Sequence, residues 1–256
     1  MGNGAAVYIP KEYSGREIVI ILPEGIDEIK RRVLTNLIEF MPNIIGVYIY
    51  GSYARGEEEK DSDIDILVIT KEKDDRIKNV LGDIDLRVLT LGGVKKTIDN
   101  YPALIMPILR EARPLLNSVL LEELKKSKID FKKLKWNFED IKRILRIIKE
   151  FIELDEKEIA PSHIYSLIMR AKVCYLIECM LKNKNFSNDN LRKIFLENGF
   201  EKQEVDRLFL IYRKVRENEE IKISVKKEEI LKLLKFIKSY SEKLEHESKK
   251  KIGKRY

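Results

Sequence analysis

The first half of the chain alternates short apolar runs with charged segments, a pattern typical of buried strands. Two runs, Ile44–Tyr50 and residues 66–69, are rich in β-branched or aromatic residues and are bounded by Gly or charged residues, which predicts strands rather than helices. Apolar and charged residues alternate over residues 82–89, which predicts a third strand. Before these strands, apolar positions recur at a helical spacing over residues 26–41, which predicts an amphipathic helix that ends at Pro42.

The second half of the chain reads as helical throughout. Stripes of Leu, Ile and Phe at helical spacing predict an all-α bundle after Trp136. The expected helices lie near residues 138–155, 161–183, 188–198, 202–217 and 226–247.

These patterns together predict an α+β (α/β) fold with a mixed sheet, followed by the all-α helical bundle. The expected division is an N-terminal β-hairpin arm at 1–23, an α/β domain at 24–117, a Lys-rich linker at 118–137, the bundle at 138–249 and a basic tail at 250–256.

Candidate chemistry gathers where the first two strands meet. Asp63 and Asp65 are two positions apart at the start of the second strand, so both side chains point to one face. Two carboxylates at the mouth of an apolar strand repel each other unless a divalent cation lies between them. Gly51-Ser52 follows the first strand, and such a turn allows a phosphate to approach free backbone N–H groups. The pattern therefore indicates phosphoryl or nucleotidyl transfer.

Gly51-Ser52, ten further residues and then Asp63-x-Asp65, with a strand on either side, resembles the signature of the DNA-polymerase-β-like nucleotidyltransferase superfamily, in particular its minimal nucleotidyltransferases. The resemblance implies that Gly51 and Ser52 hold the β- and γ-phosphates of ATP and that Asp63 and Asp65 bind two Mg²⁺ ions. It also implies a third carboxylate on the next strand, which binds metal or activates the attacking hydroxyl. Asp85 is the residue expected in that role, with Asp83 as the alternative.

The resemblance implies transfer of AMP from ATP to a hydroxyl acceptor, with release of pyrophosphate. It favours a protein adenylyltransferase of the toxin–antitoxin type, whose acceptor is a protein hydroxyl on a HEPN-type toxin. The alternatives are a small-molecule nucleotidyltransferase, like those acting on aminoglycosides, and an inactive nucleotide- or nucleic-acid-binding regulator. The bundle itself resembles either a HEPN domain or the C-terminal domain of kanamycin nucleotidyltransferase. In its nearest match to the HEPN ribonuclease motif, RKVRENEE, Asn218 and Glu220 replace the His and the Tyr, so a ribonuclease activity is not expected.

Composition adds compartment and partners. No apolar run reaches the length of a membrane span and no signal-peptide pattern opens the 256 residues, so a cytoplasmic protein without a membrane partner is expected. Residues 1–117 hold 16 Lys and Arg against 19 Asp and Glu, and the remainder holds 34 against 24. The basic half is expected as solvated helix faces, with nucleic acid a less favoured partner. The hairpin arm resembles half of an AbrB-like DNA-binding domain and is expected as a remnant or an arm for homodimerisation.

Overall fold

The computed structural model describes residues 10–15, 25–58, 62–82, 84–154, 160–221 and 225–253. The two strands predicted for the N-terminal arm lie outside these ranges, as do Asp83 and the end of the basic tail. Between the predicted strands of the arm, the described residues form a short 3₁₀ turn, Lys11–Tyr13.

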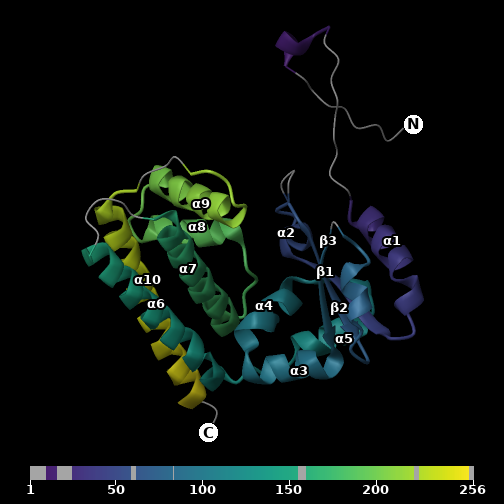
Figure 1. The fold of residues 1–256 in the computed structure, drawn as a ribbon. Coiled ribbons are helices and arrows are strands. Elements are labelled where there is room, and N and C mark those ends of the chain that lie inside the picture. Colours follow the sequence, from purple (N-terminus) through teal and green to yellow (C-terminus); the bar gives the residue numbers. More distant parts are fainter. Residues whose placement is uncertain are drawn as a thin grey trace.

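In the described part of the chain, four strands form one mixed sheet in the order β3-β2-β1-β4 (Figure 1). The strands are β1 (Ile44–Tyr50), β2 (Ile64–Thr70), β3 (Ile84–Thr90) and β4 (Arg113–Leu116). Strand β1 pairs antiparallel with both β2 and β4, whereas β2 and β3 run parallel. The predicted mixed sheet and the helical half that follows it are confirmed.

Helices cover both faces of this sheet and form the second half of the chain. Those of the first half are α1 (Ile26–Asn36), α2 (Gly51–Arg55), α3 (Leu91–Asn100), α4 (Pro102–Glu111) and α5 (Ser118–Lys125). The later helices are α6 (Lys135–Leu154), α7 (Pro161–Lys182), α8 (Asn188–Glu197), α9 (Lys202–Arg216) and α10 (Lys227–Gly253).

The structure differs from the predicted elements in two segments, one of which ends earlier and one of which contains helices. The helix expected over residues 26–41 stops at Asn36, and a 3₁₀ turn, Ile38–Phe40, follows it. This change of direction still lets Phe40 and Met41 pack on the same core as the helix. Residues 118–137, expected as a linker, contain α5, a 3₁₀ turn (Phe131–Leu134) and the start of α6.

The alternation along the strands divides the apolar residues between two cores. Val47, Ile49 and Ile66 pack with α1 on one face of the sheet. Tyr48 and Leu67 belong to the cluster on the other face, which continues through α3 and α4 into the bundle. Because this second core is continuous, apolar burial holds the bundle against the sheet face on which the odd-numbered residues of β2 lie.

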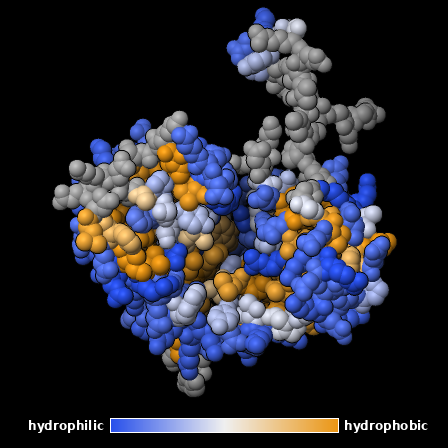
Figure 2. Space-filling model, viewed as in Figure 1, coloured by the Kyte–Doolittle hydropathy of each residue, from blue (hydrophilic) through white to orange (hydrophobic). Residues whose placement is uncertain are grey.

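Figure 2 shows that the surface between the bundle and the sheet is hollowed on the face drawn, with hydrophilic and apolar side chains on its borders. No described helix has the length and hydrophobicity that crossing a bilayer requires.

Candidate active site

The turn that ends β1 brings the backbone against a carboxylate. Gly51 opens α2 with φ at 74° and is buried, a conformation that L side chains rarely adopt. A Cβ atom built on Gly51 would lie 2.0 Å from Oδ2 of Asp65. Both the backbone angle and the contact therefore require glycine at this position. The structure thus brings together the Gly51-Ser52 turn and Asp65, which the sequence predicted to be neighbours.

Asp65 and Asp85 lie side by side on parallel strands. They are register partners of β2 and β3, and residues paired in this way project to the same face of the sheet. Asp63 is exposed and immediately precedes β2. Burial and, after it, the charges of Asp85, Asp63 and Glu111 together raise the pKa of Asp65 from 3.8 to about 6, against a lowering by Arg55. The other two aspartates expected from sequence, Asp63 and Asp85, therefore both act electrostatically on Asp65.

The donor chemistry of this cluster fits a divalent cation. Carboxylate oxygens are the ligands that Mg²⁺ takes from proteins, and the pKa of Asp65 is raised by burial first and then by the neighbouring carboxylates, with Arg55 opposing them. Among the described residues, no three His, Cys, Asp or Glu side chains converge on one point as a ready set of ligands. A metal would therefore have to draw the aspartates together, or complete its coordination with substrate phosphates and water.

Glu111, the last residue of α4, also lies at this site, although no sequence pattern predicted it. Its Oε1 accepts a hydrogen bond from the Gly51 N–H at 3.0 Å, and its Oε2 accepts one from Arg55 at 2.7 Å. Burial raises the pKa of Glu111, while Arg55 and the Gly51 N–H oppose this effect. The backbone donor of Gly51 is thus already paired with a carboxylate, so the phosphate contact predicted for it would require Glu111 to release it.

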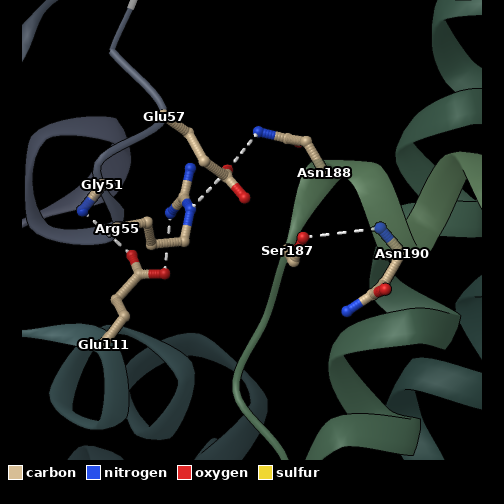
Figure 3. A network of polar contacts seen from close by, with 7 residues as sticks. All are labelled: Gly51, Arg55, Glu57, Glu111, Ser187, Asn188 and Asn190. Atoms are coloured by element: carbon tan, nitrogen blue, oxygen red, sulfur yellow. Dashed lines mark hydrogen bonds and ion pairs between the residues drawn. The ribbon is translucent and has the colours of Figure 1, made fainter.

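A chain of polar contacts links this turn to the bundle (Figure 3). Arg55 also donates to Glu57 at 2.8 Å, and Glu57 accepts from the side chain of Asn188 at 3.0 Å. Asn188 is the first residue of α8, and the Arg55 guanidinium lies 5.2 Å from the ring centre of Phe186, just before it. No sequence pattern marked these partners, because their pairing depends on how the bundle docks.

The bundle also supplies a cation on the side facing the turn. Burial and, after it, the charges of Arg216 and Arg55 together lower the pKa of Lys172, on α7, from 10.5 to about 8. Its ammonium donates to the hydroxyl of Tyr212 at 3.2 Å and lies 4.5 Å from that ring's centre. Lys172 thus carries a poorly compensated charge close enough to Arg55 to interact with it. An anionic group entering this space would relieve the repulsion.

Residues 33–99, which include the turn and all three aspartates, match the model of the family described as "Polymerase beta, Nucleotidyltransferase". No curated protein matches the chain in sequence.

Three solved structures resemble the fold distantly. Spectinomycin adenyltransferase AAD(9) from Enterococcus faecialis, with ATP and spectinomycin, is 16% identical over 83% of this chain and 96% of its own, with a TM-score of 0.45. A toxin-antitoxin with AMP-PNP is 16% identical over 48% of this chain and 98% of its own, with a TM-score of 0.30. A nucleotidyltransferase-like protein from Exiguobacterium sibiricum is 11% identical over 89% of this chain and 80% of its own, with a TM-score of 0.37. Because all three TM-scores are below 0.5, these structures carry no argument about function, which depends instead on the family match and the geometry of the site.

Proposed function

We propose that the protein transfers AMP from ATP to a hydroxyl acceptor and releases pyrophosphate, because residues 33–99 match the polymerase-beta nucleotidyltransferase family model. The observation that carries the proposal is the register of Asp65 beside Asp85, directly over the backbone of Gly51. This arrangement puts the acidic cluster next to a turn that a phosphate can approach closely.

Each expected residue has a role in this reaction. Asp63, Asp65 and Asp85 would hold Mg²⁺, which when bound neutralises charge on the transferring phosphorus and the leaving pyrophosphate. Asp85 is exposed on β3, where an acceptor can reach it, and it would take the proton from the attacking hydroxyl.

The turn and the bundle would position the triphosphate. The hydroxyl of Ser52 makes no hydrogen bond with another described residue and is therefore available to the β- or γ-phosphate. Glu111 would act as a positioning residue, because it fixes Gly51 through the N–H and Arg55 through the guanidinium. Lys172 would meet the phosphates from the bundle side, which would also raise the pKa of its ammonium.

For the acceptor we propose a protein hydroxyl, as the spacing between the Gly-Ser turn and the aspartates favours in the minimal nucleotidyltransferases. The second candidate is a small-molecule hydroxyl. It is favoured by the observation that Asn188 of α8 contacts Glu57 and that Lys172 of α7 interacts with the charge of Arg55, so the same chain would supply part of an acceptor cleft.

Incubation with ATP labelled in the α-phosphate, Mg²⁺ and cell extract tests the proposal. Label retained on a protein band supports the protein acceptor, and label on a species that passes a filter supports the small molecule. The Asp65→Asn variant should transfer no label, while Asp99→Asn, a change at an exposed position on α3, should match the original protein. Transfer at an undiminished rate by the Asp65 variant would overturn the site assignment.

A further inference from the structure

A cavity whose lining includes none of the three aspartates gathers positive charge. It has a volume of about 460 Å³ and is bordered by Arg110, Lys126, Lys128 and Lys251. These cations come from the end of α4, the segment after α5 and the last turns of α10. None of the residues that line the cavity is Asp or Glu. Four cations thus surround one hollow without a carboxylate among its lining residues.

Helix capping accounts for only part of this charge. Arg110 Nη1 donates to the carbonyl of Cys179 at 3.1 Å, and Lys251 donates to the carbonyl of Leu181. Both carbonyls belong to the end of α7, which carries roughly half a negative charge. Half a charge does not neutralise four cations. Burial lowers the pKa of Arg110, and only Cys179 opposes this effect, so its guanidinium bears a desolvation cost that no carboxylate offsets.

The floor of the cavity has a different character from its rim. Ile129, Phe131 and Met180 line it and are 5%, 7% and 3% exposed. An apolar floor below a few convergent charged groups, within a volume of some hundreds of Å³, is the usual composition of a small-molecule site. The side chains of Ser127 and Asn183 add neutral polar groups to the lining.

We propose that this cavity binds a small molecule bearing a phosphate group, which the four cations of the rim hold while any apolar part rests on the floor. Arg110 directly precedes Glu111 in α4, so such a ligand would contact the residue next to the one that fixes the Gly51 turn. The lining of this cavity shares no residue with the candidate active site, and the proposal does not rest on the transferase reaction.

Calorimetric titration of the full chain in EDTA, with the Asp65→Asn background to suppress metal-dependent nucleotide binding, tests the proposal. The probes are inorganic phosphate and AMP, each added at constant ionic strength because screening weakens exposed charges. One saturable site is expected. AMP binding more tightly than phosphate shows that the floor holds the nucleoside, and equal affinities show that the phosphate alone is recognised; both support the proposal.

The charge-reversed variant Lys126→Glu/Lys128→Glu should weaken this binding at least about tenfold, since two attractions become repulsions. The matched control is Lys193→Glu/Lys235→Glu, which makes the same change of net charge at exposed positions of α8 and α10 and should alter affinity less than about twofold. Circular dichroism would verify that both variants fold. Absence of saturable binding, or an equal loss in both variants, would overturn the proposal. Binding of single-stranded RNA without binding of either small probe would also overturn it.

Discussion

Replacement of Asp65 by Asn is expected to stabilise the protein while abolishing transfer. In the folded protein the pKa of Asp65 is raised from 3.8 to about 6, by burial first and then by Asp85, Asp63 and Glu111. The ionised carboxylate is therefore disfavoured by folding. Asn has almost the same shape and carries no charge, so the substitution removes this penalty without opening a cavity.

The gain in stability follows from the difference between the two pKa values of Asp65, 3.8 and about 6. At 1.36 kcal/mol for each pH unit, this difference gives an upper limit of about 3 kcal/mol. Asp65 is partly exposed and solvent screens its neighbours, so a gain of about 1–2 kcal/mol in the free energy of unfolding is expected. The sign depends on pH. Below pH 3.8 the carboxyl group is protonated in both the folded and the unfolded protein, so its raised pKa does not lower stability. The loss of stability grows as the pH rises and is complete above about pH 6.

Urea denaturation followed by circular dichroism at pH 8 and at pH 4 measures this difference. The free energy of unfolding of the variant should exceed that of the original protein at pH 8, and the two free energies should converge at pH 4. Asp99→Asn, at an exposed position of α3, should change stability by less than about 0.5 kcal/mol at either pH. Added Mg²⁺ should stabilise the original protein and not the Asp65 variant, because a ligand stabilises only the state that binds it. A variant that is less stable at pH 8, or a gain that persists unchanged at pH 4, would refute the electrostatic reasoning.

Three further substitutions test the positioning groups. Arg55→Met leaves Glu111 and Glu57 without their partner and should lower the free energy of unfolding by about 2–4 kcal/mol, measured by urea denaturation; a neutral result would contradict the assigned network. Asn188→Ala removes the contact from the bundle to Glu57 and should raise the KM for ATP while costing only about 1 kcal/mol of stability; an unchanged KM would show that the contact does not reach the turn. Lys172→Met should stabilise the protein at pH 7, because the pKa of Lys172 is lowered from 10.5 to about 8 in the folded protein and folding therefore disfavours its charged form. Calorimetry should also show that nucleotide binding near pH 8 takes up a proton in the original protein and not in the variant. Equal proton uptake in both proteins would exclude Lys172 as the phosphate contact.

Local sequence patterns predicted much of the fold, because the spacing of apolar residues depends on the local geometry of helices and strands. The runs that predicted β1 and β2 consist of residues whose alternation places Val47 and Ile49 on one core and Tyr48 on the other. The i, i+2 spacing of Asp63 and Asp65 depends only on strand geometry. Residues 161–183, predicted as a helix, are found as α7 at Pro161–Lys182. Segments without a strong period were harder to place, as α5 within the expected linker shows.

The sequence by itself predicted β1, β2 and β3, the helical second half and the turn and aspartates of the candidate site, because these depend on patterns among residues close in the chain. The tertiary structure alone decided what surrounds that site. Glu111 reaches Gly51 across 60 positions and Asn188 reaches Glu57 across 131. A single Glu or Asn among many carries no period that marks it. Only the shared core that presses the bundle against the sheet sets these partners within hydrogen-bonding distance.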